Sequence, residues 1–228
     1  MDATLNLAVD QEPIASTRAI LCEGSGDKNL LQELIKARAL PDFYITHPRN
    51  NIRPGGRQGF SHRLRGLRLQ PGFDELRGIA IISDSDRDRD ASFAEVRSQI
   101  HEAGFSSPNR ELDCIAGPPA IVVLMVPIGE LGQLETLCLR AIKDAWPTQF
   151  ECAEMYAQCT GISTWGMGKQ ERAKLRALIS HICKKDPNSS LTYLWHDGRE
   201  TVIPLDHECF NTIAEFLRDF DALVAAAC

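Results

Sequence analysis

The chain alternates short apolar runs with longer amphipathic segments between residues 18 and 146. Apolar runs bounded by turn residues are typical of buried strands, and apolar residues at a helical spacing are typical of helices packed on a core. The pattern predicts strands at residues 18–23, 42–48, 78–84 and 120–129. It predicts helices at residues 28–40, 91–105 and 133–146. This repeated order of strand and helix predicts an α/β fold, with a mainly parallel sheet flanked by helices.

After Pro147 the pattern becomes mostly helical. Apolar positions at a helical spacing predict further helices at residues 150–159, 169–184 and 210–226. We therefore expect three parts: an N-terminal lead-in at residues 1–17, an α/β domain at residues 18–146, and a helical C-terminal extension at residues 147–228 packed on that domain.

The composition of the 228-residue chain is that of an ordinary globular protein, with 43% hydrophobic and 25% charged residues. A net charge of -6 excludes a uniformly basic surface but allows local basic patches. The eight cysteines include no C-x-x-C pair, which favours reduced thiols over a zinc site or disulfides. We find no secretory signal and no apolar run long enough to span a bilayer, and therefore expect a cytoplasmic protein with no membrane partner.

The third predicted strand runs directly into an acidic loop. Its acids occupy every second position: Asp84, Asp86, Asp88 and Asp90. Neighbouring carboxylates repel one another, which raises their pKa values, so we expect a cation to offset them. The candidates are a divalent metal and the interleaved Arg87 and Arg89.

In an extended chain, Asp84 and Asp86 point to the same side and can hold one Mg²⁺ or Mn²⁺ together. A calcium loop is an alternative, with Asp84 at position 1 and Glu95 at position 12. That loop requires glycine where Arg89 stands and a preceding helix where a strand is predicted. The remaining alternative is a solvated loop that its arginines screen, with Asp90 capping the next helix.

Glu23 ends the first predicted strand, as Asp84 ends the third. In open parallel sheets, ligands bind outside these strand ends, so the two acids can share one crevice. Alternatively, Glu23 is a solvated or helix-capping acid, and we expect Asp27 to be the N-cap of the following helix. The stretch EGSGDKN at residues 23–29 does not have the phosphate-loop pattern.

Two basic segments are candidates for contacts to phosphates. Residues 43–73 contain several arginines and no acid, and the candidates for nucleic-acid binding are Arg53, Arg57, Arg63 and Arg65. The alternative is that these arginines balance the acidic loop. Lys169 follows Gly-Met-Gly and is a candidate for stabilising a phosphoryl transition state, although a solvated helix face is the simpler interpretation.

Taken in order, CEGSGD at residues 22–27, SDSDRD at 83–88 and GQLETLC at 132–138 resemble the Toprim fold. The nearest likeness is to small stand-alone proteins akin to the nuclease domain of the OLD family, and it covers residues 18–146. The resemblance implies that Glu23 is a general acid or base or a metal ligand. It also implies that Asp84 and Asp86 hold Mg²⁺ with Asp88 nearby, and that Asp27 and Glu135 match the acids that hold a second metal.

The resemblance and the basic segments together predict a Mg²⁺- or Mn²⁺-dependent nuclease that acts on DNA or RNA. Toprim nucleases normally carry an ATPase or DNA-binding partner domain, and nothing in this chain is long enough to be one. The alternative is therefore a non-catalytic module that binds nucleic acid or a partner ATPase.

Overall fold

Within the described residues, the chain folds around a five-stranded sheet with the strand order β2-β1-β3-β5-β4. The computed structural model describes residues 12–48, 55–183, 186, 188–195 and 202–227. Four strands run parallel to one another: β1 (Arg18–Leu21), β2 (Tyr44–Thr46), β3 (Gly78–Asp84) and β5 (Ala120–Val126). The short edge strand β4 (Cys114–Ile115) pairs antiparallel with β5. The predicted α/β class with a mainly parallel sheet is confirmed.

The sheet has a hydrophobic core on each face, because successive side chains of a strand point to opposite sides. In β3, Ala80 and Ile82 belong to one core, whereas Ile79 and Ile81 belong to the other. Every residue of β3 and of β5 is buried. A strand covered on both faces is continuously apolar, which is why residues 78–84 and 120–126 gave a clear prediction.

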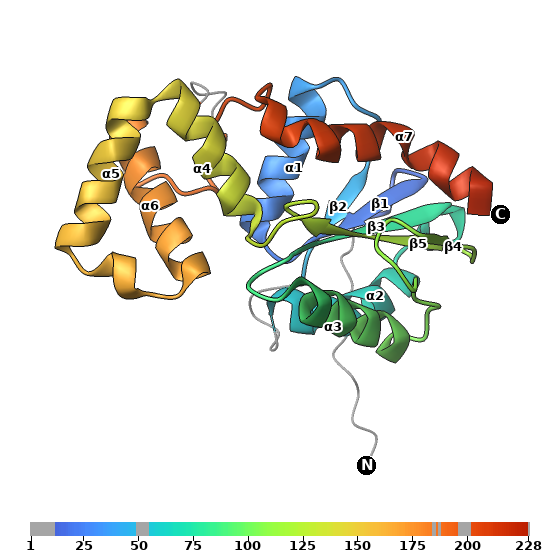
Figure 1. Cartoon of the computed structure of the whole chain (residues 1–228). Helices are drawn as coiled ribbons and strands as arrows, with labels where there is room; N and C mark the ends of the chain where they lie inside the picture. Colours follow the sequence, from blue (N-terminus) through green and yellow to red (C-terminus); the bar gives the residue numbers. More distant parts are fainter. Residues whose placement is uncertain (1–11, 49–54, 184–185, 187, 196–201, 228) are drawn as a thin grey trace, which may run out of the picture.

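Helices cover both faces of the sheet (Figure 1). One face carries α1 (Ser25–Ala37), α4 (Leu134–Ala145) and α7 (Asn211–Ala227). The other face carries α2 (Phe60–Arg68) and α3 (Arg89–Glu102). Short 3₁₀ helices lie at Gly56–Gly59 (η1), Phe73–Glu75 (η2), Ile162–Thr164 (η3) and Glu208–Phe210 (η4). In the part of the chain that the structure describes, no helix is long and apolar enough to cross a membrane.

The predicted C-terminal extension is helical, but it does not form one unit. Helices α5 (Pro147–Cys159) and α6 (Met167–Ile182) make a lobe beside α4, whereas α7 returns to the sheet (Figure 1). The rings of Phe43 and Phe220 pack edge to face with their centroids 5.3 Å apart. At the other end, part of the expected lead-in is also packed, since Ile14 is buried and its N–H donates to the carbonyl oxygen of Pro71.

Candidate functional site: an acidic pocket at the sheet edge

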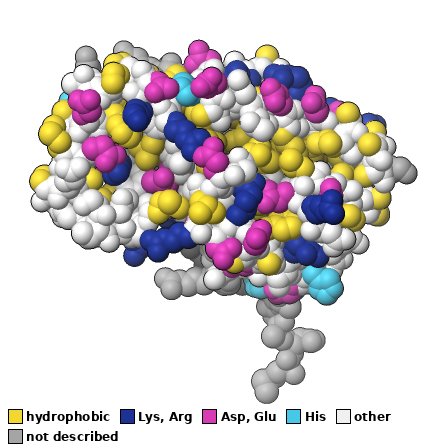
Figure 2. All heavy atoms as spheres, viewed as in Figure 1, with side chains coloured by type: hydrophobic (Ala, Val, Ile, Leu, Met, Phe, Trp, Pro, Cys, Tyr) yellow, Lys and Arg dark blue, Asp and Glu magenta, His cyan; other side chains and the backbone are white. Residues whose placement is uncertain are grey.

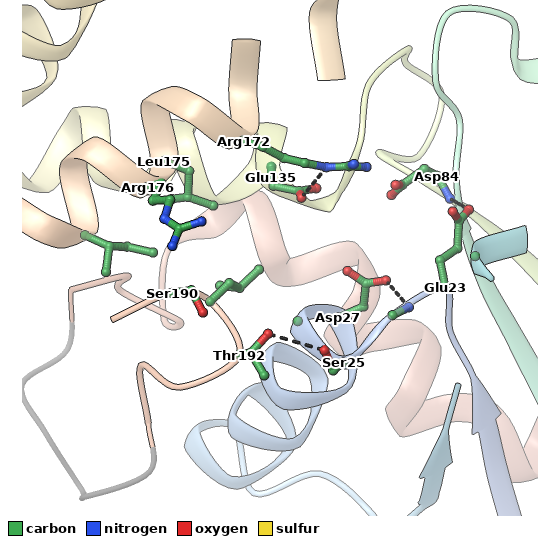
Figure 3. A pocket seen from close by; sticks show the side chains of 15 residues that line it. Glu23, Ser25, Asp27, Asp84, Glu135, Arg172, Leu175, Arg176, Ser190 and Thr192 are labelled. Carbon is green, nitrogen blue, oxygen red and sulfur yellow. Dashed lines mark hydrogen bonds and ion pairs between the residues drawn. The ribbon is translucent and has the colours of Figure 1, made fainter. Parts of the chain in front are cut away.

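A pocket of about 470 Å³ lies at the carboxyl ends of β1 and β3, bordered by α1, α4 and α6 (Figure 3). This edge of an open parallel sheet is where α/β proteins bind ligands. The charged residues that line the pocket are Glu23, Asp27, Asp84, Glu135, Arg172 and Arg176. The pocket therefore has an acidic side formed by the sheet, α1 and α4, and a basic side formed by α6.

Glu23 follows β1, and its carboxylate is held through one oxygen. Its Oε1 accepts hydrogen bonds from Ser83 Oγ at 2.5 Å, from the N–H of Asp84 at 3.0 Å and from Arg57 Nη2 at 3.1 Å. Its Oε2 accepts no hydrogen bond from the described residues. Glu23 and Asp84 therefore meet at one sheet edge, as their strand-end positions led us to expect.

The carboxylates of Asp84 and Glu135 are also each held through one oxygen. Asp84 ends β3, and its Oδ1 accepts a hydrogen bond from the N–H of Leu134 in the first turn of α4, at 3.0 Å. Glu135 also lies in that turn, and its Oε1 accepts from Arg172 Nε at 3.1 Å. The second oxygen of each carboxylate has no hydrogen bond among the described residues, although both side chains are largely buried.

Asp27 lies in the first turn of α1, where Oδ2 accepts a hydrogen bond from the N–H of Gly24 at 2.9 Å. The N-cap of α1 is Gly24, so the prediction that Asp27 is the N-cap was wrong. The helix begins two residues before Asp27, and the carboxylate caps it by reaching back. Asp27 also has one held and one available oxygen, so all four acids of the pocket share this arrangement.

Burial and mutual repulsion destabilise negative charge in this pocket. Burial, followed by the charges of Glu23, Asp27 and Glu135, raises the pKa of Asp84 well above its usual range. Burial, followed by the charges of Glu135 and Glu23, raises the pKa of Asp27 to about 7. A cation bound among these acids would stabilise their charged forms.

No group of three or more His, Cys, Asp or Glu side chains in the described part of the chain is arranged to hold a metal ion. The four acids of the pocket are close enough to influence one another's charge, but they do not form a ready-made ligand shell. The nearest positive charges come from the chain itself, at Arg57 and Arg172.

Arg57 lies in η1, with its side chain only 8% exposed, and it reaches into the acidic edge. Its guanidinium donates to Ser83 Oγ (2.9 Å), Glu95 (3.3 Å), Glu23 (3.1 Å), Asp86 (2.9 Å) and the carbonyl oxygen of Asp84 (2.6 Å). Burial opposes its charge, but the three carboxylates outweigh burial and raise the pKa of Arg57. The predicted role of Arg57 in binding nucleic acid is therefore not supported, because its donors are used inside the protein.

Asp86 does not join Asp84. The chain leaves the extended conformation after β3, and Asp86 adopts a left-handed backbone with φ of 50°. Its Oδ1 accepts from Gln133 Nε2 at 2.7 Å and its Oδ2 from Arg57 Nη2 at 2.9 Å. The expectation that Asp84 and Asp86 hold one ion rested on an extended chain, and the structure does not have that extended conformation at Asp86.

Asp88 serves as the N-cap of α3, where Oδ1 accepts a hydrogen bond from the N–H of Ala91 at 2.9 Å. It does not line the acidic pocket, so its predicted place near a metal is not supported. Asp90 lies in the first turn of α3, and the prediction that it is the cap was wrong by two residues. A calcium loop also fails, because Asp88 caps a helix while Glu95 pairs with Arg57.

The other arginines predicted to bind nucleic acid do not form an exposed stripe. Arg63 is buried and donates to Thr46 Oγ1 at 2.6 Å, so its guanidinium makes hydrogen bonds inside the protein. Arg65 is partly exposed and pairs with Glu102 of α3. Arg53 lies outside the described residues.

Lys169 is exposed near the start of α6 and does not line the acidic pocket. The cations that do line it are Arg172 and Arg176, which were not among the predicted site residues. The sequence did contain a signal for these two arginines. Leu175 and Ile179 mark the buried face of α6, and the helical spacing places Arg172 and Arg176 on that same face.

A family model matches residues 17–221 of the chain. Neither the curated proteins nor the solved structures contain a significant match. The matched segment begins next to β1 and ends within α7, so it includes the sheet, the acidic pocket and the α5–α6 lobe. Because it spans most of the 228 residues, the chain belongs to the family described as "Protein of unknown function (DUF3226)".

Proposed function

We propose that this protein is a Mg²⁺- or Mn²⁺-dependent phosphodiesterase that cleaves nucleic acid at the acidic pocket, with a Toprim-like catalytic arrangement. One observation carries the proposal. Four acids, one just after β1 and the others in α1, β3 and α4, line one pocket, each held through one carboxylate oxygen with the other available: Glu23, Asp27, Asp84 and Glu135. Acids that only cap helices or pair with arginines do not need to share a pocket.

The chemistry of these donors fits a hard divalent cation, which prefers carboxylate oxygens. Magnesium is usually held by one or two carboxylates, with water and substrate phosphate completing its shell. A ready-made group of three acids is therefore not required. Asp84 is the first candidate, because it lies within the electrostatic influence of Glu23, Asp27 and Glu135. A bound cation would supply charge neutralisation at the scissile phosphate and activation of water.

Glu23 is the candidate for accepting a proton. Three hydrogen bonds to Oε1 fix its carboxylate, which leaves Oε2 available at the pocket. A general base must be positioned before its pKa matters, and these contacts provide the positioning. Arg57 is one of the three donors, so we assign it to positioning Glu23.

The test measures cleavage of fluorescent single-stranded DNA, double-stranded DNA and RNA with Mg²⁺, Mn²⁺ or EDTA. We expect cleavage only with a metal, and at least about a 100-fold loss in Asp84→Asn and Glu23→Gln. Asn can still accept the hydrogen bond from Leu134, so Asp84→Asn should fold. Asp90→Asn is the matched control, because Asp90 is exposed and does not line the pocket.

Thermal melting with and without Mn²⁺ gives an independent measurement. A ligand that binds only the folded state raises stability by about 2.7 kcal/mol at a hundredfold excess over its Kd. Wild type, Asp86→Asn and Asp90→Asn should show a metal-dependent rise in Tm, whereas Asp84→Asn should not. Cleavage that persists in EDTA, or that Asp84→Asn leaves unchanged, would contradict the proposal.

A second function is favoured by Arg57. Its guanidinium already balances three carboxylates at the sheet edge, so the chain needs no metal to offset that part of its charge. Such internal balance suits a non-catalytic module that binds nucleic acid or a partner ATPase. Binding of an oligonucleotide by the purified chain, with no metal-dependent product, would favour this module over the phosphodiesterase.

A further inference from the structure

One face of α6 forms the basic side of the acidic pocket. Arg172, Leu175, Arg176 and Ile179 all line the pocket, and their spacing of three and four residues places them on one helix face. Leu175 and Ile179 are 3% and 1% exposed, so they anchor this face in the core. The two arginines lie one helical turn apart at the pocket, with Arg172 against Glu135 and Arg176 on the side away from Glu23 and Asp84 (Figure 3).

Both arginines have N–H donors that make no hydrogen bond with the described residues. Arg172 uses Nε on Glu135 and Nη2 on Gln133, which leaves Nη1 without a hydrogen bond among the described residues. Arg176 makes no hydrogen bond or ion pair within the described part of the chain and extends toward the pocket (Figure 3). In contrast, the N–H donors of Arg57 are hydrogen-bonded to other groups of the protein. A planar guanidinium with open donors suits a phosphate group.

The remaining lining fits an organic group attached to that phosphate. Leu191 contributes apolar surface, and the hydroxyls of Ser25 and Thr192 lie 3.3 Å apart within hydrogen-bond range of each other. Asn29 of α1 donates to the carbonyl oxygen of Thr192, which ties the segment around Leu191 to α1. The volume of about 470 Å³ is that of a small-molecule site and is too small for a duplex.

We infer that Arg172 and Arg176 form a binding site for a phosphate monoester, carried either by a free nucleotide or by the phosphorylated end of a nucleic-acid strand. The inference rests on the proposed function, because a phosphate dianion beside four carboxylates requires the divalent cation to offset their charge. Metal and phosphate should therefore strengthen each other's binding, as linkage demands. The site selects a chain end over the interior of a duplex.

The test is calorimetric titration of the full chain with AMP, with adenosine as the ligand that lacks phosphate, in the presence of Mn²⁺. We expect AMP to bind more tightly than adenosine. Arg172→Gln and Arg176→Gln should each weaken AMP binding about 10- to 100-fold, since each removes hydrogen bonds to a charged group. Arg218→Gln is the matched control, because Arg218 is an exposed helical arginine outside the pocket.

Two further arms separate the ligand sources and the two proposals. A nuclease-resistant phosphorothioate tetranucleotide, with and without a 5′-phosphate, distinguishes a strand end from a free nucleotide as the preferred ligand. Titration with Mn²⁺ alone should give the same response in Arg176→Gln as in wild type, because Arg176 forms no ion pair with an acid among the described residues. If AMP binds in the presence of Mn²⁺ and the protein shows a Mn²⁺ response but no metal-dependent cleavage, the phosphodiesterase proposal fails and the arginine site stands.

The inference would be overturned by no binding of AMP by wild type, by equal binding of AMP and adenosine, or by unchanged AMP binding in both arginine variants. Loss of the Mn²⁺ response in Arg176→Gln would show that this arginine maintains the pocket and does not bind ligand. That result would also overturn the inference.

Discussion

Asp27 has two roles that oppose each other. Its carboxylate caps α1 through the N–H of Gly24, which favours the charged form, yet it is buried beside Glu135 and Glu23, which favours the neutral form. Burial and repulsion prevail, and they raise the pKa of Asp27 to about 7. An unfolded aspartate has a pKa of about 3.9, so the folded chain binds the proton more tightly.

This difference predicts that the metal-free protein loses stability as the pH rises from about 4 to about 7. The stabilisation is fully present below the unfolded pKa and is lost as the pH passes the folded pKa. We expect Asp27→Asn to flatten the profile of unfolding free energy against pH by roughly 1–3 kcal/mol, measured by urea unfolding in EDTA. The control is Asp74→Asn, since Asp74 is exposed in η2. Parallel profiles for Asp27→Asn and wild type would contradict the assignment.

Arg57 shows what the sequence could not predict at this scale. The sequence identified an acid-free, arginine-rich stretch and left two interpretations, phosphate contacts or balance of the acidic loop. It could not decide between them, because the choice depends on which guanidinium groups folding buries. The structure buries Arg57 and Arg63, and it places Arg57 against three acids from distant segments.

Removal of a buried arginine leaves its acids uncompensated, so we expect Arg57→Gln to lower the unfolding free energy by about 3 kcal/mol. Arg65→Gln is the comparison, because Arg65 pairs with Glu102 at a partly exposed site and should cost under about 1 kcal/mol. Urea unfolding of both variants at neutral pH measures the difference. If both variants lose the same unfolding free energy, the carboxylates around Arg57 are solvated well enough to stay charged in the folded protein without this arginine.

At the scale of elements, the sequence predicted best where a single physical signal dominated. The continuous apolar runs of β3 and β5 predicted both strands, and the positions of Glu23 and Asp84 at the ends of the first and third strands predicted their convergence. The positions of side chains after a strand end were not predictable in this way. The left-handed backbone at Asp86 turns its carboxylate to Gln133 and Arg57, and no alternation of polar and apolar residues encodes that turn. The return of α7 to the sheet also depends on packing between distant segments.

The packing of α7 on β3 leads to a prediction about Gly78. A Cβ added there would lie 2.7 Å from Val224 Cγ2 and 2.9 Å from Phe220 Cζ, both in α7. We expect Gly78→Ala to lower the unfolding free energy by about 1–3 kcal/mol through overpacking, although alanine suits a strand better than glycine. The control is Gly66→Ala within α2, where the nearest atom to a new Cβ is 3.7 Å away, and which should stabilise the protein by up to about 1 kcal/mol. A stabilised Gly78→Ala would show that α7 does not press on this strand.

At the scale of the whole molecule, the distribution of charge over the surface bears more on nucleic-acid binding than the net charge does. Figure 2 shows basic and acidic side chains interspersed over one face, without a large region of one sign. The net charge is -6, and two of the arginines first considered for nucleic-acid binding are buried. If the protein binds nucleic acid as proposed, it should do so through a few local contacts, in which Arg172 and Arg176 are the open donors of the pocket.

The number of phosphates neutralised sets the salt dependence of nucleic-acid binding, at about 0.7 per phosphate for single strands. Because Arg172 and Arg176 together bind one terminal phosphate, they alone predict a slope of log K against log salt of about −0.7, whereas four phosphates bound by arginines from residues 43–73 would give about −3. Fluorescence anisotropy of a 5′-phosphorylated oligonucleotide with Mn²⁺, between roughly 50 and 200 mM salt, measures the slope. The double variant Arg172→Gln, Arg176→Gln should bring it near zero. A slope of about −3 that survives in the double variant would show that other cations of the chain bind the strand, and would return the contact surface to the segment around Arg53.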